Sequence, residues 1–386
     1  MKRIIALLIL VILSTQGIRN AQSGSAKPIR IGSVLPLTGI FSAEGSEMKN
    51  AIELAREEIN EAGRILGHTL EIIWEDTESN AVGATRAFKK LVYVHAVPII
   101  LSGISPSINT LLGQEIQQSK ILHITIGPAV PRFREPGPYF FSVMGSAADM
   151  GTELANMVIE ASNPKTLGFI TLDSLLGRTI QKSAKRAFQN KGIKIVAEAW
   201  PTIGKTDFSS HLLRLYKQRP EVAILTAFGN QSKLILEQAS QAGFALQKSG
   251  WYAPYIDLLI KHVTPDVSAG LAGVTLGVVQ EKYKNFVNKY KQRFREVPET
   301  MFSVYAYDAT KILADAIRLA KSTDPDKIKD ALLKIKYLGV TGSKSFDQDG
   351  MVVSQIYQRL FFKEGKLVKF RPCPMPPWCK YIKYQK

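Results

Sequence analysis

The chain has 386 residues, of which 45% are hydrophobic and 22% are charged, and its 50 Lys and Arg residues against 33 Asp and Glu residues give a formal net charge of +17. This composition excludes an intrinsically disordered chain, a glycine-rich collagen-like chain and, because only two cysteines are present, a disulfide-rich scaffold. At about 150 residues per domain, the length favours two domains. The positive charge is compatible with nucleic acid, an anionic membrane surface or a solvated face, and it bears on association and not on fold.

The first residues have the pattern of a secretory signal peptide. Two basic residues precede an apolar run at 4–13, which is shorter than the roughly 20 residues that a membrane-spanning helix needs. We therefore expect residues 1–26 to form the signal, with small residues suited to cleavage at 15–17 or at 24–26, and the mature chain to lie outside the cytoplasm. A short uncleaved anchor is the alternative.

The mature sequence begins with a β-α-β pattern. A strand is predicted over 29–35, a loop over 36–45, a helix with apolar residues at helical spacing over 48–62, and a second strand over 70–74. Such a unit requires parallel strands, with helices packed on the faces of the sheet.

Two further strands are predicted over 97–101 and 121–126, and a serine-rich loop over 102–107 follows the first of them. Ligands of open α/β sheets lie beyond the carboxyl ends of the strands, so this loop is a candidate binding segment. Ser105 and Ser107 place hydroxyl groups at a helix N-terminus, where free N–H groups favour an anion. Alternatively, Ser107 only caps the helix.

The same pattern starts again in the second half of the chain. Residues 140–143 are expected to cross between domains, after which a strand over 166–172, a loop over 173–178, a helix over 180–188 and a strand over 193–197 are predicted. Two such starts indicate two similar α/β domains.

No motif of an enzyme, a metal site or a cofactor site is found. The chain contains no H-E-x-x-H, G-x-S-x-G, Walker or G-x-G-x-x-G pattern, and His123, within an apolar strand, is predicted to be a satisfied core residue. A serine hydrolase built on Ser105 or Ser107 would need a histidine and an acid from distant segments. The late basic residues alternate with apolar ones at helical spacing, which favours a solvated helix face over a nucleic-acid interface.

The two cysteines, Cys373 and Cys379, bracket a stiff Pro-Met-Pro-Pro-Trp segment. An oxidising compartment would close this loop as a disulfide. Two free thiols are the alternative, and a metal site would need two further ligands.

Four segments, taken in their order along the chain, resemble the periplasmic solute-binding proteins of the leucine/isoleucine/valine-binding kind, which serve ATP-driven importers. The segments are IRIGSVLPLTGIFSAEGSEMKNAIELAREEINEAG, IILSGISPS, FVNKYKQRFREVPETMFSVYAYDATKILADAI and FDQDG. The resemblance implies a monomer that captures a small solute by hinge closure and delivers it to ABC permease subunits. It implies no catalysis, no cofactor and no nucleic-acid partner. A sensor of the same fold without transport is the alternative.

The fold implied by this resemblance is the type I periplasmic binding fold, with two Rossmann-like α/β lobes that have parallel sheets and are joined by a three-crossing hinge. The first lobe would comprise 28–141 and 278–344, and the second lobe 142–277 and 345–386.

The resemblance also implies which residues hold the carboxylate of a solute. Ser105 matches the serine of the first cleft loop, and Ile126 and Gly127 match positions that bind through the backbone. Ala129 stands where amino-acid-binding members carry a threonine hydroxyl.

Other matched positions depart from the amino-acid-binding pattern. Leu176 replaces a tyrosine, Tyr255 replaces the acid that pairs with the ligand ammonium, and Glu44 stands where an aromatic residue is common. Because a buried ammonium without a partner costs several kcal/mol, these departures favour a less cationic solute, such as an aromatic or aliphatic acid or an amide, unless Glu44 or Asp257 substitutes. The residues expected to line the cleft are Phe41, Leu176, Ala227, Phe228 and Tyr255, with Trp251 and Tyr252 as further aromatic candidates. Alternatively, half of these aromatic residues belong to the core.

Overall fold

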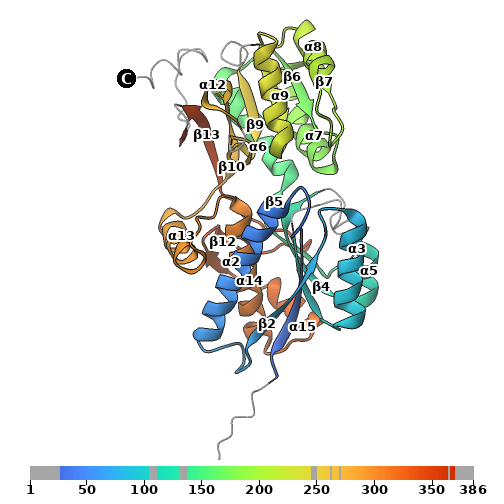
Figure 1. Ribbon diagram of the computed structural model, residues 1–386, viewed down its shortest axis with the longest axis vertical. Helices are drawn as coiled ribbons and strands as arrows, with labels where there is room; N and C mark the ends of the chain where they lie inside the picture. The colour runs from blue at the N-terminus through green and yellow to red at the C-terminus, as the bar shows by residue number, and fades with distance from the viewer. Residues whose placement is uncertain are drawn as a thin grey trace, which may run out of the picture.

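The computed structural model describes residues 27–103, 111–130, 137–244, 250–260, 263–268, 271–363 and 366–369. These residues form two α/β lobes that follow one another along the long axis of the molecule (Figure 1). The predicted fold class is confirmed. Within the described ranges, no helix is both long enough and apolar enough to cross a membrane.

The first lobe is built on a five-stranded parallel sheet. Its central strands are buried on both faces and are therefore almost continuously apolar. In spatial order the strands are β2 (Leu70–Asp76), β1 (Ile29–Leu35), β3 (Ile99–Ser102), β4 (Leu122–Ala129) and β5 (Phe140–Ser146). The helical segments of this lobe are α2 (Ser42–Glu61), α3 (Ala81–Lys89), the π-helix η1 (Lys90–Val94), α5 (Gly113–Ser119), α13 (Gln280–Phe294), α14 (Met301–Ala320) and α15 (Pro325–Leu332). A hairpin of β11 (Tyr337–Gly339) and β12 (Gly342–Lys344) completes it.

The second lobe is built on a seven-stranded sheet whose last two strands are antiparallel to their neighbours. In spatial order the strands are β7 (Lys194–Ala199), β6 (Thr166–Thr171), β8 (Val222–Thr226), β9 (Trp251–Pro254), β10 (Ala272–Leu276), β13 (Tyr357–Lys363) and β14 (Lys366–Lys369). The helices are α6 (Ala147–Ser162), α7 (Leu175–Gln189), α8 (Ser209–Lys217), α9 (Gly229–Gln241), α11 (Ile256–Ile260) and α12 (Pro265–Ser268).

Two helices begin earlier than the sequence predicted, so the predicted loops 36–45 and 173–178 are wrong at their ends. Helix α7 begins at Leu175 because the Ser174 hydroxyl accepts the Gly177 N–H at 3.0 Å and caps the helix. Helix α2 begins at Ser42, and at Gly45 it approaches the preceding loop so closely that a Cβ would lie 1.9 Å from the Pro36 carbonyl oxygen.

The chain passes between the lobes three times, from β5 to α6, from β10 to α13 and from β12 to β13. Hydrogen bonds tie the third crossing to both others, since Ser142 N–H donates to the Gly350 carbonyl at 2.9 Å and Gly277 N–H donates to the Ile356 carbonyl at 2.7 Å. These contacts form the three-crossing hinge that the resemblance implied.

Candidate ligand-binding site

Both sheets repeat one strand order, and this order marks a binding position in each lobe. The spatial orders are β2-β1-β3-β4-β5 in the first sheet and β7-β6-β8-β9-β10 in the second. When the strands of each lobe are numbered along the chain, both orders read 2-1-3-4-5. In such sheets the connections diverge between the first and third strands, and ligands bind at the carboxyl ends of these two strands. The two positions are therefore beyond β1 and β3 in the first lobe, and beyond β6 and β8 in the second.

The two binding edges are directed toward one another by the path of the chain. Strand β5 leaves the carboxyl edge of the first sheet and leads directly into the second lobe, and β10 leaves the carboxyl edge of the parallel strands of the second sheet and leads into the first lobe. Each carboxyl edge therefore lies on the side of its lobe from which the chain crosses to the other.

At the first edge, the loop after β1 is held by Asp76, which ends β2. Its carboxylate accepts hydrogen bonds from Leu37 N–H at 2.9 Å, from Thr38 N–H at 3.2 Å and from the Thr38 hydroxyl at 2.6 Å. Burial raises the pKa of this carboxyl, but the hydrogen bonds lower it by more, so the net pKa lies below its ordinary value. Asp76 therefore fixes the position of the segment that leads to Phe41.

Phe41 and Glu44 lie where this loop enters α2, and both side chains are partly buried. The Phe41 N–H donates to the Ser79 hydroxyl at 3.1 Å, which fixes the start of the helix. Among the described residues, the Glu44 carboxylate has no hydrogen-bond or ion-pair partner, and its place in the first helical turn suits the positive end of the helix dipole.

The predicted backbone positions at the end of β4 are already engaged within the lobe. The Gly127 N–H donates to the Thr125 hydroxyl at 3.1 Å, and the Gly127 carbonyl accepts from the Ser142 hydroxyl at 2.9 Å. The side chains of Ile126 and Ala129 are buried in the core. A ligand that uses Gly127 N–H must displace or share the Thr125 hydroxyl. Ser105 and Ser107 lie within the segment 104–110, which is outside the described residues, as are Cys373 and Cys379.

The buried histidine of the first lobe does not form a catalytic triad with its neighbours. The Nε2 atom of His123 lies 2.5 Å from the Ser102 hydroxyl, and burial lowers the pKa of the imidazole to about 3. Within the described chain, its Nδ1 atom has no hydrogen-bond partner, so no acid orients the ring. His123 is a neutral core residue, as predicted, but only one of its two ring nitrogens is satisfied.

At the second edge, Leu176 lies in the first turn of α7, and Ala227 and Phe228 follow β8. Leu176 and Phe228 are partly buried, while Ala227 is buried. These segments flank the position between β6 and β8, so the structure brings three of the predicted residues to one end of the second sheet.

Tyr255 follows β9 and stands close to Phe228, with the two ring centroids 6.2 Å apart. Its backbone is left-handed, with a φ of 50°, which costs a non-glycine residue free energy and re-aims the chain after the strand. Burial raises the pKa of the Tyr255 phenol well above its usual value, so this side chain is neutral. Asp257, two residues later, accepts a hydrogen bond from the Thr275 hydroxyl.

Trp251 and Tyr252 are core residues and do not line the cleft. They lie within β9 and are 0% and 2% exposed, packed among the apolar residues on opposite faces of the sheet. The interpretation of these two aromatics as cleft walls was wrong because a parallel strand covered on both faces buries consecutive side chains.

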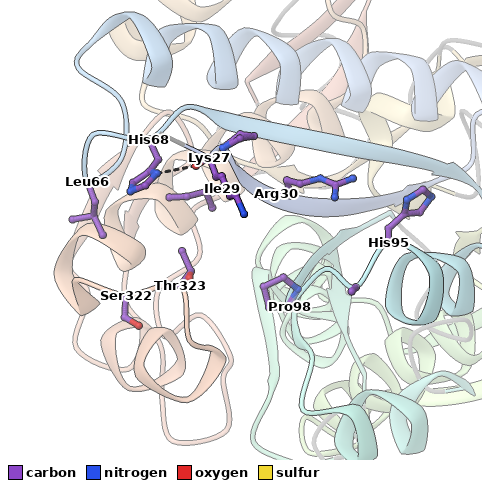
Figure 2. Close-up of a pocket in the computed structure, with 11 residues that line it drawn as sticks. Lys27, Ile29, Arg30, Leu66, His68, His95, Pro98, Ser322 and Thr323 are labelled. Carbon is purple, nitrogen blue, oxygen red and sulfur yellow. Dashed lines mark hydrogen bonds between the residues drawn. The ribbon is translucent and has the colours of Figure 1, made fainter. Parts of the chain in front are cut away.

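A separate pocket of about 510 Å³ lies at the opposite edge of the first sheet (Figure 2). It is lined by residues at the amino ends of β1 and β3, among them Arg30 and Pro98, and the His68 Nδ1 atom lies 2.8 Å from the Lys27 carbonyl oxygen. Its place at the amino ends separates it from both binding edges. In the described part of the chain, no three His, Cys, Asp or Glu side chains are grouped to hold a metal ion.

The architecture agrees with a family comparison. A model of the family described as periplasmic binding protein matches residues 28–359. The chain belongs to the periplasmic binding protein family. Members of this family are solute-binding proteins that bind small-molecule solutes and work with ABC transporter permeases.

Relatives and solved structures extend over most of the chain. The Leu/Ile/Val-binding protein homolog 7 of Brucella abortus is 23% identical, over 94% of this chain and 96% of the relative. The branched-chain amino acid transporter substrate binding protein LivJ of Streptococcus pneumoniae, in complex with isoleucine, has a TM-score of 0.79 at 22% identity and covers 88% of this chain and 97% of its own. A solute binding protein of an ABC transporter from R. palustris, in complex with benzoate, has a TM-score of 0.79 at 16% identity, over 89% of this chain and 95% of its own.

Proposed function

We propose that this periplasmic binding protein is the extracytoplasmic component of an ABC importer that captures a small carboxylate-bearing solute by hinge closure and delivers it to the permease. The observation that carries this proposal is the repeated strand order, which places a binding edge in each lobe on the side that leads to the other. Binding to both edges favours the closed arrangement, so a permease can distinguish the loaded protein from the empty one.

The solute that these edges fit best is an apolar acid without an ammonium group. Phe41, Leu176 and Phe228 supply partly buried apolar side chains, and the resemblance matches neutral Tyr255 to the position at which amino-acid-binding members carry an acid. The two ligands named for the structural neighbours, isoleucine and benzoate, share a carboxylate on an apolar body and differ in the ammonium. Enclosing an ammonium without a carboxylate partner costs several kcal/mol, which favours a solute that, like benzoate, has no ammonium.

A matched pair of solutes tests this choice. L-leucine and 4-methylpentanoate have the same carbon skeleton and carboxylate, and only leucine carries the ammonium. We expect isothermal titration calorimetry to show at least tenfold tighter binding of 4-methylpentanoate, with benzoate as a second acid. Tighter binding of leucine would contradict the choice of solute. If Glu44→Gln then weakened leucine alone, Glu44 would be the missing ammonium partner.

Closure and delivery need separate measurements. With a bound solute, small-angle scattering should show a smaller radius of gyration, and an unchanged shape under saturating solute would contradict hinge closure. Stimulation of the ATPase activity of the reconstituted permease by the loaded protein tests delivery, and its absence would favour a sensor. Protease accessibility in spheroplasts tests the extracytoplasmic location.

A further inference from the structure

One charged side chain is fully buried at the hinge. Lys344 ends β12, immediately before the third crossing, and is 0% exposed. Its ammonium has one hydrogen bond among the described residues, to the Gln355 Oε1 atom at 3.5 Å, the upper limit for such a bond. The Nζ atom also lies 5.2 Å from the centroid of the Tyr305 ring. Because an ammonium has three donors, this charge is poorly satisfied.

The charged and titratable groups around Lys344 do not neutralise it. Asp308 attracts it from α14, but among the described residues the two form no ion pair within 4 Å, and the Asp308 carboxylate already accepts from Val340 N–H and from the N–H and hydroxyl of Thr341. The Tyr305 phenol, whose ring faces the ammonium, interacts in turn with Asp308, Tyr357 and Asp257, and Tyr337 interacts with Asp308. Burial lowers the pKa of Lys344 to about 8, and Asp308 only partly opposes this effect.

Gln355 connects this lysine to the first crossing. Its Oε1 atom, the acceptor for Lys344, also accepts the Gly145 N–H at 3.2 Å, and its Nε2 atom donates to the Tyr305 hydroxyl at 2.5 Å. Gly145 lies near the end of β5, between Met144 and Ser146, which pair with β4, and a Cβ at this position would lie 2.9 Å from the Cβ and Cγ atoms of Gln355. The Gln355 Oε1 atom is therefore shared by two donors, one at the end of β5, where the first crossing begins, and one at the end of β12, where the third crossing begins.

Among the described residues, no hydrogen bond or ion pair joins the loops at 36–41 and 76–80 to those at 173–178 and 227–230, whereas the crossings are hydrogen bonded to one another. Closure of the lobes must therefore turn the crossings, and a turn of the first crossing against the third changes the distance between Gly145 and Gln355.

We propose that closure breaks the hydrogen bond from Gly145 N–H to the Gln355 Oε1 atom and strengthens the hydrogen bond from the Lys344 ammonium to the same atom. The positive charge on Lys344 then favours the closed arrangement. A charge-assisted hydrogen bond in place of a neutral one favours closure by about tenfold, since such bonds differ by roughly 1.4 kcal/mol. Lys344 and Gln355 are positioning residues, because they act on the cleft through the crossings. The proposal rests on the hinge and holds whichever solute the cleft takes.

The distance between the lobes, measured without any solute, tests this proposal. Helices α3 and α7 lie on the same side of the molecule, one in each lobe (Figure 1), so spin labels at Val82→Cys and Lys182→Cys report closure. The labelled parent carries Cys373→Ser and Cys379→Ser. We expect the ratio of the short-distance to the long-distance population in pulsed electron spin resonance to be about tenfold higher at pH 7.0 than at pH 9.5, where Lys344 is neutral.

Two variants with opposite expected effects make the test specific. Lys344→Met should show the pH 9.5 distribution at both pH values. Gly145→Ala should raise the closed fraction at pH 7.0, because the added methyl group pushes Gln355 away from the Gly145 N–H. Lys336→Met, which removes an exposed charge near β11, is the matched control and should keep the pH dependence. A parent without pH dependence, a Lys344→Met variant that keeps it, or a Gly145→Ala variant that opens the protein would overturn the proposal.

Discussion

Replacing Lys344 by methionine should stabilise the folded protein at neutral pH. Methionine keeps most of the buried aliphatic length and removes an ammonium that is 0% exposed and has a single long hydrogen bond. Replacement of poorly satisfied buried charges by apolar residues of similar volume is commonly neutral or stabilising by about 1 to 4 kcal/mol.

The magnitude follows from the pKa of the lysine. Burial lowers it from 10.5 to about 8, and at about 1.4 kcal/mol per pKa unit the charged form destabilises the folded state by roughly 3 kcal/mol. Below pH 8 the lysine is charged in both states, so the destabilisation is complete. Between pH 8 and 10.5 the unfolded chain binds more protons than the folded chain, so the free energy of unfolding rises with pH by up to about 1.4 kcal/mol per unit.

Urea unfolding of the parent and of Lys344→Met at pH 7.0 and 9.5 measures this effect. The gain should be about 3 kcal/mol at pH 7.0 and should shrink to roughly half of that or less at pH 9.5, because most of the pKa difference has then been titrated. Other lysines titrate equally in both proteins and cancel in the difference. Lys336→Met, at an exposed site, should change little. A gain that is equal at both pH values, or a loss at pH 7.0, would refute the reasoning.

Three further substitutions test the supports of the site and the hinge. Asp308→Ala should destabilise the protein by about 3 to 5 kcal/mol in urea unfolding, because the buried carboxylate accepts four hydrogen bonds from the segment 337–341; a loss below 1 kcal/mol would show that these bonds contribute little. Asp76→Ala should cost about 1 to 3 kcal/mol at pH 7 and weaken solute binding, and since the pKa of Asp76 is lowered in the folded state, the difference should vanish as the pH falls through that pKa. A difference that does not shrink as the pH is lowered would contradict the role of its charge. Gly151→Ala places a Cβ 2.2 Å from the Ile180 carbonyl oxygen, so it should lower the thermal midpoint by several degrees by separating α6 from α7, and an unchanged midpoint would show that the helices adjust freely.

The sequence predicted the fold well because the fold depends on periodicity. Apolar runs bounded by Gly and Pro mark buried parallel strands, and apolar residues at helical spacing mark the helices between them, so both β-α-β starts were found. The helix starts at Ser42 and Leu175 were missed because helix ends depend on local contacts, such as the Ser174 cap on Gly177 N–H and the close approach of Gly45 to Pro36. Periodicity carries no information on such contacts.

The site was predicted less completely, and for a different reason. Trp251 and Tyr252 were expected at the cleft because aromatic residues are common in ligand sites, yet burial on both faces of β9 makes them core. Asp308 had a detectable signal, because it is the one charged residue among the buried residues of α14, most of which are apolar. Lys344 had none, because its burial results from α14, β11 and the third crossing meeting around it in the folded chain.

Asp308 and Lys344 divide the segment before the third crossing into a fixed part and a movable part. Four hydrogen bonds to Asp308 attach residues 337–341 to α14, so rotation of the lobes cannot begin there without breaking buried bonds. Lys344 follows with one weak bond, and Gln355 and Gly145 meet beyond it. A neutral residue at position 344 would make the folded protein more stable. The charge of Lys344 therefore contributes only to the motion of the crossings during closure. If Lys344→Met gains stability and loses closed population together, one buried charge accounts for both effects; a gain in stability with unchanged closure would show that the charge has no part in the motion.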